Sequence, residues 1–174
     1  KNKPAYYWVP LLGLYTGARL NELCQLYVND IKEVDKIWCI DINRNTNDKK
    51  LKNASSERAI PIHPKLIELG FLNFVKEQKK NNSQRWFSHL KLGSDGYIKN
   101  VSRFFNVKWL PEIGVKTSKK SFHSLRHTFA NELKQVGVNE QVASELLGHA
   151  SQSITYARYG KESRIEVLLE QISR

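Results

Sequence analysis

The segment 122–136 carries the clearest apolar periodicity in the chain. Its large apolar side chains recur at spacings of three and four residues, at Phe122, Leu125, Phe129 and Leu133. This spacing places them on one face of an α-helix. Gly137 follows, and glycine readily takes the left-handed conformation that ends a helix. We therefore predict a helix over residues 122–136 that buries one face against the rest of the protein.

The remaining pattern predicts a mainly helical α+β fold with one small antiparallel sheet in the N-terminal third. Residues 37–42 and 59–62 have the character of strands, and a polar, lysine-rich loop over 43–55 joins them. Pro61 indicates that the returning strand is an edge strand or ends early, because proline cannot donate to a sheet. Further helices are predicted over 8–15, 19–27, 64–79, 97–110, 139–147, 151–159 and 162–172.

The chain has 174 residues, no methionine and a formal net charge of +11. Its length fits one domain, so we assign residues 1–174 to a single unit, and the missing methionine indicates a piece of a longer protein. No apolar run approaches the roughly 18 residues that span a bilayer. A large positive charge is typical of proteins that bind a polyanion, nucleic acid first of all. A basic protein kept soluble by its charge is the alternative.

The two cysteines, Cys24 and Cys39, lack metal-ligand spacing and are too few for a disulfide scaffold. Both lie in apolar segments, which predicts small buried side chains. Reduced cysteines favour an intracellular compartment.

Three polar residues lie where a helix begins or along its flank. His123 and Arg126 are three residues apart and share a flank of the helix over 122–136. Arg19 begins a helix, where its charge opposes the helix dipole. There it can bind an anion such as phosphate together with the helix terminus. It can instead pair with Glu22 one turn later and be purely structural.

His149 lies in a turn after Gly148, and Tyr159 follows ten residues later. With the residues above, they fall into four short motifs in this order: Thr16-Gly17-Ala18-Arg19-Leu20-Asn21-Glu22-Leu23, His123-Ser124-Leu125-Arg126-His127-Thr128, Leu146-Leu147-Gly148-His149 and Tyr159. This ordered set covers roughly residues 11–161. It resembles the signature of the tyrosine recombinase, or phage integrase, catalytic domain.

The resemblance implies a role for each residue. Arg19 and Arg126 match the two arginines that clamp the scissile phosphate, whose charge grows in the transition state. His123 matches a hydrogen-bond partner of that phosphate and proton acceptor, and His149 matches a further histidine on the same phosphate. Tyr159 matches the nucleophile, which forms a 3′-phosphotyrosyl intermediate. The family uses neither ATP nor metal, so no cofactor is expected.

The family also places a lysine on the β-hairpin, where it protonates the leaving 5′-oxygen. The candidates here are Lys49, Lys50 and Lys52. Lys52 matches the family pattern because it lies six residues before Arg58, an arginine on the returning strand. Binding of backbone phosphates is the alternative role for any of these lysines.

The spacing to the nucleophile departs from the family pattern by one residue. The family's tyrosine commonly lies nine residues after the motif histidine, whereas Tyr156 and Tyr159 lie seven and ten residues after His149. The ending Tyr159-Gly160-Lys161 resembles a variant found in some phage-type integrases. We therefore assign Tyr159 as the nucleophile and Tyr156 as a packing residue.

The resemblance further implies an enzyme that integrates or excises a phage or mobile element in the cytoplasm of a bacterial host. Its partner is double-stranded DNA, on which the family forms a homotetramer, and an N-terminal core-binding domain usually completes the DNA clamp. The family typically docks the C-terminal helix, here 162–172, on a neighbouring subunit; packing on its own core is the alternative. A DNA-binding module without catalysis and a type IB topoisomerase are the competing functions.

Overall fold

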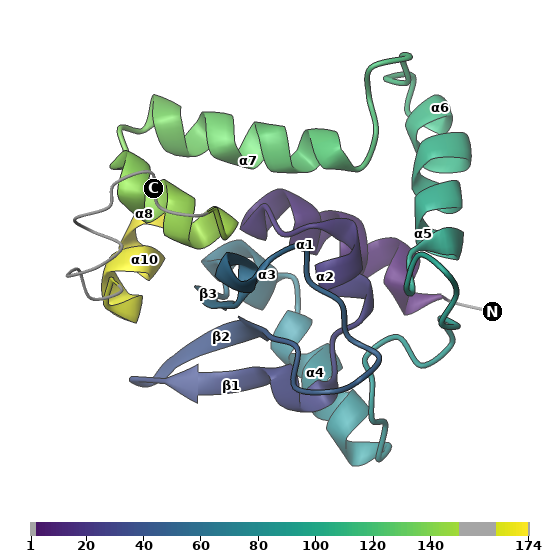
Figure 1. Ribbon diagram of the computed structural model, residues 1–174, viewed down its shortest axis with the longest axis horizontal. Coiled ribbons are helices and arrows are strands. Elements are labelled where there is room, and N and C mark those ends of the chain that lie inside the picture. Colours follow the sequence, from purple (N-terminus) through teal and green to yellow (C-terminus); the bar gives the residue numbers. More distant parts are fainter. Residues whose placement is uncertain (1–2, 150–162, 174) are drawn as a thin grey trace.

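The computed structural model describes residues 3–149 and 163–173 (Figure 1). Its elements are α1 (Pro4–Thr16), α2 (Leu20–Cys24), η1 (Val28–Asp30), β1 (Ile31–Val34), β2 (Ile37–Ile42), η2 (Ala54–Ser56), β3 (Arg58–Pro61), α3 (Pro64–Glu68), α4 (Phe71–Lys80), α5 (Lys99–Arg103), η3 (Phe104–Trp109), α6 (Leu110–Glu112), α7 (His123–Gln135), α8 (Glu140–Leu147) and α10 (Ile165–Ile172). The segments η1 and η2 are 3-10 turns, and η3 is π-helical. The predicted fold class is confirmed.

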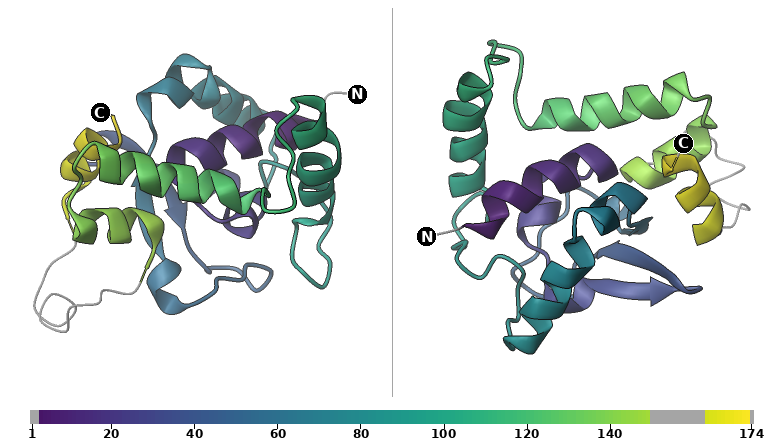
Figure 2. Two further views of the ribbon diagram at one scale, coloured as in Figure 1. Left: turned by 90° about the horizontal axis from the view of Figure 1, so that it is seen from above. Right: turned by 180° about the vertical axis from the view of Figure 1, so that it is seen from behind.

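Helix α7 packs against α1 through the predicted apolar stripe. The fully buried members of the stripe are Phe122, Phe129 and Leu133. A β-carbon added at Gly13 of α1 would lie 2.6 Å from Cζ of Phe122, so the two helices approach this closely only because position 13 is glycine. Figure 2 shows α7 lying across α1 in the view from above. The predicted helix over 122–136 is confirmed.

The sheet is antiparallel with strand order β1-β2-β3. Strands β2 and β3 are the two predicted ones, and their register pairs Ile40 with Ile60. Pro61 lies in β3, which is an edge strand as predicted. Strand β1 was not predicted, because Ile31 is the only one of its four residues that is fully buried. Its two central residues are charged, so the alternation that identifies a strand is missing.

Two predicted helices have different bounds in the structure. The helix expected over 64–79 is divided into α3 and α4 at Gly70, which has a φ of 88°. The helix expected over 97–110 continues through Pro111 to the end of α6. Pro111 lies in the first turn of α6, just after the π-helical η3, where a missing backbone N–H breaks no α-helical bond.

Helix α2 is shorter than the predicted helix over 19–27, whose apolar face extended to Tyr27. The helix ends at Cys24, and Tyr27 forms a single β-bridge with Arg85 instead. Cys24 and Cys39 are buried and free, as predicted. Burial raises the pKa of both thiols, that of Cys39 to about 11.

Helices α8 and α10 lie at one end of the molecule, and the run α5–η3–α6 lies at the other (Figure 1). Helix α10 packs on β3 of its own chain and buries Ile165, Leu168 and Ile172. The structure therefore shows the alternative expected for this helix, which is packing on its own core. The helix expected over 151–159 lies outside the described residues. Within the described ranges, every helix is too short or too polar to cross a membrane.

Candidate active site

Arg126 of α7 joins three parts of the chain that are far apart in sequence. Its side chain is buried, with a relative exposure of 6% for the residue. Nη1 donates to the carbonyl of Gly17 at 2.7 Å, and Nη2 donates to the carbonyl of Leu147 at 2.5 Å. Nη2 also lies 2.8 Å from Nε2 of His149. A guanidinium only donates hydrogen bonds, so Nε2 accepts and the ring proton of a neutral His149 is on Nδ1.

Two helix ends hold Arg126 in place. Gly17 caps the C-terminus of α1 and Gly148 caps that of α8, and both glycines are left-handed, with φ values of 63° and 65°. The last carbonyls of each helix thereby turn toward the guanidinium. A cation at a helix C-terminus is favourable, because it faces the negative end of the helix dipole. The two glycines that were predicted to end helices thus form the binding site of the Arg126 side chain.

Other cationic side chains lie close to Arg126. Burial lowers the pKa of Arg126 to about 10, and the neighbouring Arg19 and Arg58 lower it as well. The guanidinium stays charged at neutral pH, so the cluster repels itself when no anion is bound. A bound anion relieves that repulsion, which makes the site suitable for a phosphate.

Arg19 is both paired and open to solvent. Its Nη1 donates to Oε1 of Glu22 at 2.8 Å and to Oγ of Ser56 at 3.2 Å. Arg19 therefore does pair with Glu22. Both contacts use Nη1, and a guanidinium has five donors in all. The Arg19 side chain is 21% exposed while that of Glu22 is 2% exposed, so Arg19 can pair and still bind an anion.

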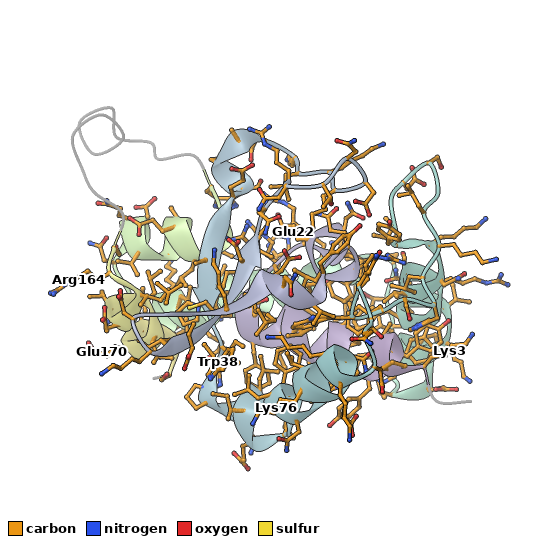
Figure 3. The ribbon with its side chains drawn as sticks, turned by 90° about the horizontal axis from the view of Figure 1, so that it is seen from below. Lys3, Glu22, Trp38, Lys76, Arg164 and Glu170 are labelled. Atoms are coloured by element: carbon orange, nitrogen blue, oxygen red, sulfur yellow. The ribbon has the colours of Figure 1, made fainter. Side chains whose placement is uncertain are left out.

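Arg58 also belongs to the site, although no site role was predicted for it. Its Nε donates to the carbonyl of Leu146 at 2.7 Å, and Nη2 donates to Oε2 of Glu22 at 3.0 Å. Burial acts to raise the pKa of Glu22, but Arg58 and Arg19 bring it below its usual value. Figure 3 shows Glu22 toward the middle of the molecule. A charged residue within a short, otherwise apolar strand was the available signal for Arg58.

The packing of Arg58 against the C-terminal end of α8 can be tested by substitution at Gly148. A β-carbon at Gly148 would lie 2.6 Å from Nη1 of Arg58, whereas one at Gly137, which is also left-handed, would have nothing within 4 Å. Gly148→Ala and Gly137→Ala share the backbone strain of about 1–2 kcal/mol. We expect Gly148→Ala to cost about 1 kcal/mol more in urea unfolding, because it displaces a buried hydrogen-bonded arginine. Equal losses in the two variants would contradict the packing of Arg58 on Gly148.

The two histidines are kept neutral. Burial lowers the pKa of His123, and the charges of His127, Arg126, Arg19 and Lys52 lower it further. The rings of His123 and His127 meet edge to face with centroids 4.7 Å apart. Burial also lowers the pKa of His149, helped by the charge of Arg126 first and by that of Lys52 among others. A neutral imidazole can accept a proton at physiological pH.

The three hairpin lysines have different surroundings. Lys49 is buried, and its Nζ lies 2.8 Å from both carboxylate oxygens of Asp30. Lys50 is exposed, and its backbone N–H donates to Oε1 of Gln25 at 2.9 Å. Lys52 is exposed, and its charge lowers the pKa of both site histidines. Lys49 is therefore occupied elsewhere, and Lys52 is the candidate whose charge reaches the site.

Three of the predicted residues, Arg19, His123 and Arg126, line a hollow of about 230 Å³. Its lining residues are Ala18, Arg19, Leu20, Ser102, Asn106, Ser121, Phe122, His123 and Arg126. His149 is joined to this group through Arg126. The three polar residues Ser102, Asn106 and Ser121 were not predicted, because no local pattern marks them. The predicted nucleophile Tyr159 and its alternative Tyr156 lie outside the described residues.

Comparison with known proteins identifies relatives of this chain. The model of the "Phage integrase family" matches residues 4–164. The tyrosine recombinase of Thermosipho africanus is 32% identical over 146 residues, which are 81% of this chain and 44% of that protein. Tyrosine recombinase XerD of Chlamydia muridarum is 32% identical over 160 residues, 87% of this chain and 47% of that protein. The chain thus spans about half the length of these relatives.

Among solved structures, the Tn1549 transposon integrase in complex with circular intermediate DNA has the same fold. Its TM-score is 0.59 at 21% identity, and the match covers 92% of this chain and 56% of that one. The matched range covers most of the chain, and the positions of Arg19, His123, Arg126, His149 and Tyr159 fall within it. The chain belongs to the phage integrase family, whose members are tyrosine recombinases.

Proposed function

We propose that this chain is the catalytic part of a site-specific recombinase that cuts and rejoins DNA through a 3′-phosphotyrosyl intermediate. One observation carries the proposal: Arg19, His123 and Arg126 line one hollow, and His149 is bonded to Arg126. This arrangement gives two planar guanidinium groups and the His123 imidazole around a space that is large enough for a phosphate. A second imidazole, His149, is bonded to one of those guanidinium groups.

The chemistry assigns one task to each group. The Tyr159 oxygen attacks the scissile phosphorus while His123 takes the phenolic proton. The bond from phosphorus to the 5′-oxygen breaks, and Lys52 gives that oxygen a proton. Arg19 and Arg126 stabilise the charge that develops on the non-bridging oxygens. In the second step the 5′-hydroxyl of another strand attacks the phosphotyrosine, which releases Tyr159 and reseals the DNA.

We also propose that double-stranded DNA is bound by a homotetramer that exchanges its C-terminal helices, and that the reaction integrates or excises a phage or mobile element. The ending Tyr159-Gly160-Lys161, which resembles that of some phage-type integrases, supports the element-borne role. Exchange requires α10 to leave β3 of its own chain, which exposes Ile165, Leu168 and Ile172. Their apolar surface supplies a reason for the helix to dock on a neighbour.

The proposal is tested by trapping the covalent intermediate. The protein is incubated with a pool of nicked duplexes of random sequence, in which cleavage releases a short strand and prevents religation. We expect a subset of duplexes to stay attached after denaturation in detergent, and sequencing them gives the target site. DNA binding without any attachment would contradict the recombinase proposal and support a DNA-binding module.

The lysines beside the hollow provide a separate prediction about DNA binding. Lys119 and Lys120 are exposed and lie just before Ser121, whereas Lys76 and Lys80 are exposed on α4. Lys119→Gln/Lys120→Gln should lower the slope of log Kd against log salt by about 2, because each lost phosphate contact removes about one released counterion. The matched double variant Lys76→Gln/Lys80→Gln should leave the slope unchanged in fluorescence anisotropy. In Figure 3, Lys76 lies away from Glu22, the carboxylate that pairs with Arg19 and Arg58.

A further inference from the structure

Lys49 is a buried cation that the proposed reaction does not use. Its side chain is 2% exposed, and that of its partner Asp30 is 8% exposed. Nζ donates to both carboxylate oxygens of Asp30 at 2.8 Å and to Oδ1 of Asn43 at 2.7 Å. These three bonds use all three ammonium protons. Asp30 in turn accepts from Nδ2 of Asn43 at 2.9 Å, so each of the three side chains is bonded to the other two. Asp30 also accepts from the backbone N–H of Tyr27 at 2.6 Å.

This network attaches the β2–β3 loop to the body of the protein. Asp30 ends η1, before the sheet begins, while Lys49 lies in the loop itself. Other bonds hold the same stretch. Asp48 accepts from the hydroxyls of Tyr27 and Tyr97, and the backbone N–H of Lys50 donates to Gln25 at 2.9 Å. The loop is therefore fixed up to position 50.

The other side of Lys52 is fixed as well. Oγ of Ser56 donates to Oδ1 of Asn53 at 2.6 Å. Arg19 donates to the same Ser56 hydroxyl at 3.2 Å. Only Leu51 and Lys52 lie between the two sets of anchors, and Leu51 packs against the core. The Lys52 side chain is thus exposed on a backbone that is held on both sides.

We infer that Lys49, through Asp30 and Asn43, is a positioning residue that sets the hairpin loop so that Lys52 meets the leaving 5′-oxygen. The inference rests on the proposed function, in which Lys52 is the proton donor. Burying an ion pair is expensive unless each charge is fully compensated, and here the compensation fixes one loop geometry. The loop is then formed before DNA binds, so Lys52 needs no ordering step to act.

The role of Lys52 makes this inference testable by changing the leaving group. With a sulfur in place of the bridging 5′-oxygen, the leaving group is a thiolate. A thiol is far more acidic than an alcohol, so it departs without a proton donor. A defect in the position of Lys52 should slow cleavage of the oxygen substrate only. A general loss of folding should slow cleavage of both substrates.

Lys49→Met is compared with Lys32→Met, which removes an exposed lysine paired with Asp41 at 2.9 Å in the same sheet. On the oxygen substrate, single-turnover cleavage by Lys49→Met should fall by about 10- to 100-fold, as for a misplaced catalytic group. On the sulfur substrate it should match the unmodified protein. Lys32→Met should cleave both substrates normally. Lys52→Ala should show the same rescue by sulfur as Lys49→Met.

Asp30→Asn/Lys49→Met removes both charges, while the side-chain oxygen at position 30 can still accept from the Tyr27 N–H as Asp30 does. The double variant therefore covers the case in which Lys49→Met does not fold. It should show the same rescue by sulfur. Equal slowing on both substrates, or normal cleavage of the oxygen substrate by the double variant, would overturn the inference. If Lys52→Ala shows rescue and Lys49→Met does not, only the positioning role is wrong. If the unmodified protein cleaves neither substrate, the proposed function fails first.

Discussion

Arg126→Lys should slow formation of the covalent DNA adduct by about 10²- to 10³-fold, the loss expected when one group that stabilises the transition-state charge is removed. Lysine keeps the charge but lacks the planar fork that bonds to Gly17, Leu147 and His149 together. One or both carbonyls then lose their partner, so the variant should also be less stable by about 1–3 kcal/mol in urea unfolding. The rate is measured at enzyme excess.

Arg164→Lys is the matched control, because Arg164 is exposed and lines a neighbouring hollow with Arg58 and His149, but does not line the hollow of Arg19, His123 and Arg126. In Figure 3 it lies at the edge of the molecule. It should change neither the rate nor the stability by a measurable amount. The rate and stability effects of Arg126→Lys are separated by repeating the measurement well below the unfolding midpoint, where the variant is fully folded. An adduct rate within a few-fold of the unmodified protein would exclude Arg126 from the phosphate clamp.

The surroundings of Arg126 also show what can be predicted from residues that are close together in the sequence. Gly17 and Gly148 were assigned as helix stops from the residues around them, and both have left-handed backbones. The position of Arg126 beside the apolar stripe of α7 was also predictable, because it follows from the spacing of residues along a single helix. The position of a residue within a helix or strand depends on its neighbours in the sequence, so these features could be predicted.

Contacts between segments that are distant in the sequence could not be predicted in the same way. Arg58 reaches the carbonyl of Leu146, 88 residues away, and nothing in strand β3 specifies that partner. Ser102 and Asn106 line the hollow only because the run α5–η3–α6 packs beside α1. The division of the predicted 64–79 helix at Gly70 is a different case. There the glycine was visible, but its effect depended on how α3 and α4 pack together.

The same contacts explain how a cluster of cations is held together without a bound anion. Glu22 is a buried carboxylate that accepts from both Arg19 and Arg58, and the carbonyls at two helix ends accept from Arg126. The arginines are thus fixed by neutral dipoles and one anion, so little reorganisation is needed when a phosphate arrives. The cluster is therefore preorganised to bind an anion such as phosphate.

Tyr159→Phe should abolish the covalent adduct entirely while leaving DNA affinity unchanged. The phenolic oxygen forms the bond to phosphorus, and phenylalanine removes that atom and little else. Tyr156→Phe is the matched control, because it makes the same change three residues earlier. It should retain the adduct. The measurement is the fraction of nicked DNA that stays attached to protein in detergent.

The chain also allows the attached residue to be identified directly. Arg158 lies between the two tyrosines, so trypsin releases Tyr156 in the peptide 135–158 and Tyr159 in the peptide 159–161. Mass spectrometry after nuclease digestion should find the nucleotide on 159–161. A nucleotide on 135–158 instead, with the adduct lost in Tyr156→Phe and kept in Tyr159→Phe, would transfer the nucleophile to Tyr156. The phosphate clamp would be unaffected by that result, because Arg19, His123 and Arg126 line the hollow whichever tyrosine attacks.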